Sequence, residues 1–217
     1  MTKPLVVVNF KNYVSGKAAL DLARNIEIYY NSAIIAVPFL DVKEIAKEVN
    51  LTVFSQHVDL QEPGRSTGFI IPESLAGVGA QGTILNHSEH KLSFSLIKRT
   101  VDRCNSVGLK TIICTSTLKD VQKILKLKPF AIAFEDPKLI GSGRSVTKED
   151  STVVASFAKL LEKTDVIPLC GAGISSADDV AKSIILGCKG VLVASAVAKP
   201  ATPGSEEKFL KGLASLF

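Results

Sequence analysis

The chain has 217 residues, 46% of them hydrophobic, which is enough apolar material for one large domain or two small ones. Its formal net charge is +5, but the lysines and arginines are scattered and form no basic block, so we expect no nucleic-acid partner. No apolar segment approaches the roughly 18 residues of a membrane span, and we expect no membrane partner either.

The cysteines and the amino-terminal segment bear on the compartment. No pair of cysteines has CxxC or metal-ligand spacing, so we expect reduced thiols and no metal site; the four are Cys104, Cys114, Cys170 and Cys188. The apolar run in "MTKPLVVVNFKNY" is too short for the core of a signal peptide. These features predict a cytoplasmic protein.

Short runs rich in β-branched residues recur along the chain and predict strands. There are eight of them, at 5–10, 33–37, 51–56, 82–86, 110–115, 130–135, 166–170 and 190–195. Most are apolar on both faces, which is typical of parallel strands that are covered on both sides.

Segments with apolar residues at three- and four-residue spacing separate these strands and predict helices, for example at 18–30, 41–49, 94–108 and 150–163. Strand and helix alternate without a Pro/Gly-rich linker, which predicts one (β/α)8 barrel domain of eight parallel strands over residues 1–217. A doubly wound open sheet is the alternative, but the GxGxxG turn typical of it is absent after the first strand, where the chain reads "NFKNYVSGKA".

Polar residues at the carboxyl ends of the strands are the first candidates for function, because the active site of such a barrel is built there. Asn9 and Lys11 follow the first strand, His87 follows the fourth, and Glu135 ends the sixth. A cation, an imidazole and a carboxylate would then share one mouth.

His87 lies in the stretch "ILNHSEHK". Asn86 and Glu89 have the spacing of a capping box, which predicts that His87 occupies the first turn of a helix. Free backbone N–H groups there would disfavour imidazolium and leave a neutral ring that can donate a hydrogen bond. The alternative is an ordinary surface or capping histidine.

Small residues after the last two strands suggest an anion site. The loop "CGAGIS" at 170–175 precedes a helix that opens at Ser176, and the eighth strand ends at Ala194 and Ser195. Glycines let backbone N–H groups converge on an anion, and barrels often hold phosphate with these two loops. A tight turn that merely needs small residues is the alternative for the first loop.

Glu135 is followed by "DPKLIGSG" at 136–143, which has a proline at one end and glycines at the other, as a hinged lid would. A carboxylate beneath a closing lid is well suited to act as a general base, because water is expelled around it. A rim glutamate in a surface salt bridge is the alternative for Glu135, and an ordinary solvated lysine is the alternative for Lys11.

Taken together, five segments resemble the triosephosphate isomerase family, and specifically its shorter archaeal form. They are "NFK" (9–11), "LNHSEHKL" (85–92), "FEDPKLIGSG" (134–143), "CGAGIS" (170–175) and "GVLVASAVAK" (190–199). The resemblance covers nearly the whole chain. It implies a TIM barrel without a cofactor that interconverts dihydroxyacetone phosphate and D-glyceraldehyde 3-phosphate through an enediol(ate), in glycolysis and gluconeogenesis.

The resemblance also implies a role for each residue. Glu135 would move the proton between the two carbons, and His87 would polarise the carbonyl. Lys11 would stabilise negative charge beside Glu89, and Asn9 would order the substrate. Backbone N–H groups would hold the phosphate, and those implied are at Ile140, Gly141, Gly173, Ala194 and Ser195.

The chain departs from the family in two places. Phe10 stands where many members have tryptophan, and Thr67-Gly68 is followed by Phe69 rather than glutamate. In the family this third loop, here 57–71, enters a neighbouring subunit. The resemblance therefore implies a homo-oligomer, a dimer or a tetramer, and the archaeal form favours the tetramer.

Two other functions fit a phosphate-binding barrel. An aldolase with a Schiff-base lysine would have that lysine at the end of the sixth strand, where this chain has Glu135. A non-catalytic phosphate-binding protein would have no need of Glu135, His87 and Lys11 together. Both alternatives are therefore less favoured than the isomerase.

Overall fold

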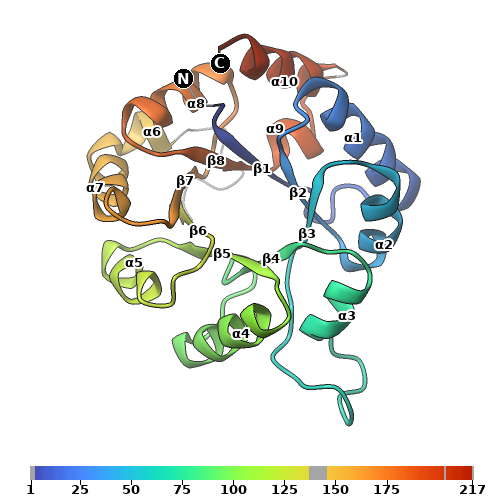
Figure 1. The fold of residues 1–217 in the computed structure, drawn as a ribbon. Helices are drawn as coiled ribbons and strands as arrows, with labels where there is room; N and C mark the ends of the chain where they lie inside the picture. Colours follow the sequence, from blue (N-terminus) through green and yellow to red (C-terminus); the bar gives the residue numbers. More distant parts are fainter. Residues whose placement is uncertain (1–2, 137–145, 203, 217) are drawn as a thin grey trace.

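In the computed structural model, which describes residues 3–136, 146–202 and 204–216, eight parallel strands form a closed barrel in chain order (Figure 1). The helices lie outside the strands and surround them. The predicted fold class is therefore confirmed, and the alternative of an open doubly wound sheet is wrong. None of the described helices combines the length and apolar character needed to cross a membrane.

The strands coincide with the predicted runs to within one or two residues at each end. They are β1 Leu5–Asn9, β2 Ile34–Val37, β3 Thr52–Ser55, β4 Gly82–Leu85, β5 Lys110–Thr115, β6 Ala131–Glu135, β7 Ile167–Gly171 and β8 Gly190–Val193. The helices are α1 Gly16–Tyr29, α2 Phe39–Glu48, α3 Pro72–Gly77, α4 Phe94–Ser106, α5 Leu118–Leu125, α6 Val146–Glu149, α7 Ser151–Leu161, α8 Ala177–Ile185, α9 Ser195–Ala198 and α10 Ser205–Leu216.

Two apolar layers follow from the alternation of side chains along each strand. In β1, Val7 belongs to the cluster inside the barrel, whereas Val6 and Val8 belong to the cluster between the strands and the helices. Because both faces of the strands are buried, the strand sequences read as continuous apolar runs. Burying one such valine or isoleucine side chain contributes about 1.5–3 kcal/mol.

The barrel closes where β1 pairs with β8, and this contact joins the two ends of the sequence. Leu5 lies opposite Gly190, and Val8 lies opposite Val193. A Cβ atom at Gly190 would lie 2.0 Å from the carbonyl oxygen of Leu5, so only glycine allows this approach. Closure therefore places residues 9–11 beside residues 194–195.

Candidate active site

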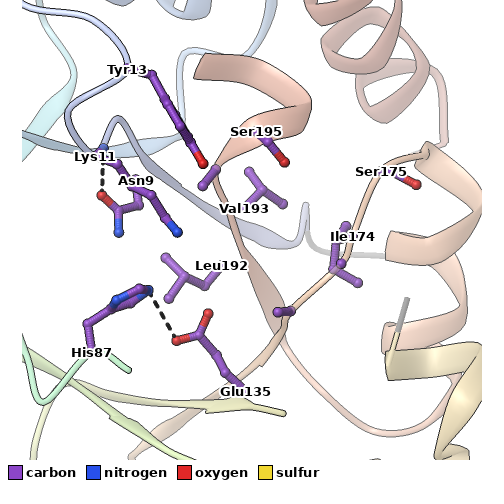
Figure 2. A pocket seen from close by; sticks show the side chains of 13 residues that line it. Asn9, Lys11, Tyr13, His87, Glu135, Ile174, Ser175, Leu192, Val193 and Ser195 are labelled. Atoms are coloured by element: carbon purple, nitrogen blue, oxygen red, sulfur yellow. Dashed lines mark hydrogen bonds and ion pairs between the residues drawn. The ribbon is translucent and has the colours of Figure 1, made fainter. Parts of the chain in front are cut away.

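The strand ends that closure brings together form one pocket at the mouth of the barrel (Figure 2). Seven of the predicted site residues line it: Asn9, Lys11, His87, Glu135, Gly173, Ala194 and Ser195. They come from β1, β4, β6, β7 and β8 or from the loops that follow these strands. The other two, Ile140 and Gly141, lie outside the described residues, as does most of the predicted lid.

Glu135 is the last residue of β6 and is buried, with 6% of its surface exposed. It lies opposite Gly171 in β7, and a Cβ atom there would approach its Cγ to 3.1 Å, so glycine leaves room for the carboxylate. Within the described part of the chain, its Oε2 has no hydrogen-bond partner. This position agrees with the prediction that Glu135 faces the mouth of the barrel, and not with the alternative of a surface salt bridge.

Burial dominates the electrostatics of this carboxylate. It raises the pKa of Glu135 above its ordinary value, because the charged form loses hydration, while the neighbouring His87 ring, the thiol of Cys114 and the ammonium of Lys11 oppose the shift. A carboxylate with a raised pKa is a stronger base than a solvated one. The site thus contains a buried base with an unsatisfied oxygen.

His87 does not lie in a helix, so the predicted capping box is wrong. Helix α4 begins only at Phe94, where the Ser93 side chain accepts a hydrogen bond from the N–H of Leu96. Asn86 instead adopts a left-handed backbone conformation with φ of 59°, which asparagine tolerates. Its amide donates to the Cys114 carbonyl (2.8 Å) and accepts from the Leu92 N–H (3.0 Å), tying the loop to β5.

The predicted neutral, donating imidazole nevertheless follows from the loop geometry. The backbone N–H of Glu89 donates to Nδ1 of His87 at 3.2 Å. Because an N–H can only donate, Nδ1 accepts and the ring proton resides on Nε2. That Nε2 lies 3.6 Å from Oε2 of Glu135, across the pocket (Figure 2). The backbone N–H of Glu89, rather than a helix terminus, thus leaves the ring with its donor on Nε2.

Lys11 supplies the cation of the pocket. Its ammonium lies 2.6 Å from Oε1 of Glu89, and 11% of its side chain is exposed. Its backbone is left-handed, with φ of 48°, which costs about 1–2 kcal/mol in a residue other than glycine. The side-chain oxygen of Asn9 accepts a hydrogen bond from the Lys11 N–H at 2.9 Å, which helps to hold that conformation.

The loops after β7 and β8 offer backbone N–H groups beside the pocket. At the start of α8, Asp179 completes a capping box with Ser176 and accepts hydrogen bonds from the N–H groups of Ser175 and Ser176, so these two N–H groups are engaged within the chain. Gly173 has φ of 77°. Within residues 3–136, 146–202 and 204–216, the N–H groups of Gly173 and Ser195 meet no acceptor.

Sequence reasoning missed Tyr13 as a residue of the pocket. Its ring centroid lies 6.0 Å from the Lys11 ammonium and 5.5 Å from that of Lys199. Its position two residues after Lys11, in the loop that follows β1, is the signal that could have identified it. No group of three or more potential metal ligands occurs among the described residues.

Comparisons with known proteins identify the family. The family model described as triosephosphate isomerase matches residues 4–211. The triosephosphate isomerase of Sulfurisphaera tokodaii is 37% identical over 210 residues, covering 94% of this chain and 92% of the relative. That of Archaeoglobus fulgidus is 39% identical over 203 residues, covering 90% and 91%.

A solved structure gives an independent comparison of the fold. The crystal structure of triosephosphate isomerase from Bartonella henselae superposes with a TM-score of 0.75 at 17% identity and covers 99% of both chains. The superposition extends over the whole barrel, and the family match extends over nearly all of the sequence. The chain therefore belongs to the triosephosphate isomerase family.

Proposed function

We infer that this chain is an intramolecular isomerase that interconverts dihydroxyacetone phosphate and D-glyceraldehyde 3-phosphate, a step of glycolysis and gluconeogenesis. Membership of the family supports this activity. The observation that carries the assignment of roles is the convergence of Glu135, His87 and Lys11 on one pocket.

Glu135 is the base that removes a proton from one substrate carbon and returns it to the neighbouring one. Its burial supports this role, because the desolvated carboxylate holds a proton more strongly than a solvated one. The unsatisfied Oε2 faces the same space as the His87 ring, where the reacting carbons would lie. Gly171 leaves that space open beside Glu135.

His87 polarises the substrate carbonyl through the proton on Nε2. The hydrogen bond from Glu89 N–H to Nδ1 supports this role, because it fixes the tautomer in which Nε2 is the donor. Lys11 stabilises the negative charge that develops on the enediolate oxygen, and Asn9 orders the substrate beside it. Both of these residues line the pocket.

The substrate phosphate binds to backbone N–H groups of Gly173, Ala194 and Ser195, in the loops after β7 and β8. The N–H groups of Gly173 and Ser195 without acceptors among the described residues support this position. Free N–H groups in glycine-containing loops are common ligands of phosphate. Ile140 and Gly141 remain predicted ligands from the segment outside the described residues.

A Schiff-base aldolase is a weaker alternative, because such a lysine must be uncharged when it attacks a carbonyl. The side-chain nitrogen of Lys11 instead lies 2.6 Å from a carboxylate oxygen of Glu89 and is engaged in this ion pair. Lys11 is therefore suited to electrostatic stabilisation and poorly suited to imine formation.

We propose that the chain works in the cytoplasm as a homo-oligomer, and that it is a tetramer rather than a dimer, as the resemblance to the archaeal form of the family implies. Loop 57–71, between β3 and α3, extends away from the barrel (Figure 1). It carries Phe69, which is 49% exposed, and Leu40 in α2 is 88% exposed. A subunit contact at loop 57–71 would remove the side chain of Phe69 from water, which is favourable for an apolar ring.

Replacing the cation of the pocket tests the proposed activity. In an assay that couples glyceraldehyde 3-phosphate formation to a dehydrogenase, we expect Lys11→Met to lower kcat/KM roughly 100- to 1,000-fold, because the charge that stabilises the transition state is removed. Lys17→Met is the matched control, since Lys17 is exposed and its ammonium pairs with Asp21 instead. Activity of Lys11→Met within a few-fold of the wild type would refute the proposed role.

Replacing the buried base tests its electrostatics through stability. The folded pKa of Glu135 is raised above its ordinary 4.5, so the wild type loses stability as the pH rises through the folded pKa, and a glutamine does not. We expect the free energy of unfolding of Glu135→Gln, relative to the wild type, to increase between about pH 4 and about pH 8 in urea titrations. The exposed Glu62→Gln should show no such trend. A flat or opposite trend for Glu135→Gln would show that burial does not disfavour the charge.

Light scattering coupled to size-exclusion chromatography tests the assembly. We expect a mass of four chains that persists on dilution. A mass of two chains would contradict the tetramer while retaining the oligomer, and a mass of one chain would contradict both. Phe69→Asp should lower the mass if loop 57–71 contributes to a subunit contact, because the carboxylate that replaces this exposed ring would have to be buried in that contact.

A further inference from the structure

Gln56 lies immediately after the end of β3, and its side chain reaches the backbone that follows β1. Its Nε2 donates to the carbonyl oxygen of Lys11 at 2.8 Å and to that of Ala36 at 3.3 Å. Both acceptors are backbone carbonyls, so the amide must present its nitrogen, which has two protons to donate. One side chain thus links the ends of β1, β2 and β3.

The carbonyl that Gln56 binds belongs to the residue with the left-handed backbone in the pocket. Asn9 holds the N–H of Lys11 at 2.9 Å, and Gln56 holds its C=O. No other donor in the described part of the chain meets that carbonyl. The peptide groups on both sides of the strained Lys11 Cα are therefore fixed by side chains.

The second acceptor strengthens this arrangement. The carbonyl of Ala36 also accepts the N–H of Phe10, at 2.9 Å, which is the last backbone bond from the β1 segment to β2 before Lys11. Gln56 therefore ties the conformation of Lys11 to the point where the pairing of β1 with β2 ends. A change of φ at Lys11 would have to break its bond to this amide.

We propose that Gln56 is a positioning residue for Lys11: its amide holds the left-handed backbone from which the lysine ammonium reaches the substrate. The proposal rests on the proposed function, in which Lys11 stabilises negative charge. Gln56 lines a neighbouring pocket that shares Lys11 and His87 with the pocket of Glu135, but it does not line the pocket of Glu135 itself. Its amide nitrogen is engaged with the carbonyls of Lys11 and Ala36, so we place its action on Lys11 rather than on the substrate. A backbone shift away from the reacting atoms lowers the reaction rate strongly when it displaces a charged catalytic group.

The first experiment compares Gln56→Met with the wild type in the coupled assay. Methionine has a similar length but no donor, so Lys11 can relax toward ordinary backbone angles. We expect kcat/KM to fall roughly 10- to 100-fold. Tyr30→Phe is the matched control, because it removes another side-chain donor to a backbone carbonyl, the 2.7 Å bond to Pro4, away from the pocket. It should lower stability without changing kcat/KM.

The second experiment separates positioning from a merely structural role. The dissociation constant of 2-phosphoglycolate, a phosphate-bearing analogue, is measured calorimetrically for the wild type, Gln56→Met, Lys11→Met and the double variant. We expect each single change to weaken binding and the double variant to bind no more weakly than Lys11→Met, because Gln56 has no effect once the ammonium is absent.

The outcomes distinguish this proposal from the function on which it rests. If Gln56→Met weakens binding equally with and without the Lys11 ammonium, or leaves kcat/KM unchanged, Gln56 is not a positioning residue for Lys11. If Lys11→Met itself binds as tightly as the wild type, the proposed role of Lys11 fails instead. Should Gln56→Met not fold, Gln56→Asn keeps the amide but is one methylene shorter; wild-type kinetics of the folded Asn variant would overturn the proposal.

Discussion

The pairing of β1 with β8 is the contact on which the site depends. Without it, the residues after β1 and those after β8, at opposite ends of the sequence, would not face one pocket. The contact is possible because Gly190 has no side chain to meet the Leu5 carbonyl. Parallel pairing around the barrel then directs every strand end toward the same mouth.

Within that mouth, backbone groups and uncharged amides set the chemistry of the charged residues. A single N–H from Glu89 determines which nitrogen of His87 donates. The carboxylate of the same residue pairs with Lys11, so Glu89 links the cation to the imidazole. The absence of a side chain at Gly171 leaves Glu135 space in a dry environment that raises its pKa. The functional side chains thus depend on supports that come from neighbouring strands.

The barrel and the strand ends could be predicted because burial on both faces leaves the same local pattern in each of the eight strands. Strands buried on both faces read as apolar runs, and the residue where each run stops identifies the mouth, which located Lys11, His87 and Glu135. The resemblance to a family added the roles of these residues. The lid at 136–143 stays a prediction, since it lies almost entirely outside the described residues.

The wrong prediction at Asn86 and the missed residue Gln56 have a different physical origin, because both depend on contacts between distant segments. The spacing of Asn86 and Glu89 matched a capping box, but the amide of Asn86 is engaged with the carbonyl of Cys114 in β5, which local spacing does not reveal. Gln56 was missed for the same reason, since its acceptors, at Lys11 and Ala36, lie on two other strand ends. Side-chain bonds to the backbone of distant strands leave no periodic signal in the sequence.

The central claim is that the loop after β4 presents a neutral imidazole whose Nε2 proton faces the buried carboxylate. Nitrogen NMR of the histidine rings in the folded, ligand-free enzyme at about pH 7 measures this directly, with His87→Gln used to assign the signals. We predict that His87 has a protonated Nε2 and an unprotonated Nδ1 that accepts the Glu89 N–H. A ring protonated on Nδ1, or on both nitrogens, would contradict the account.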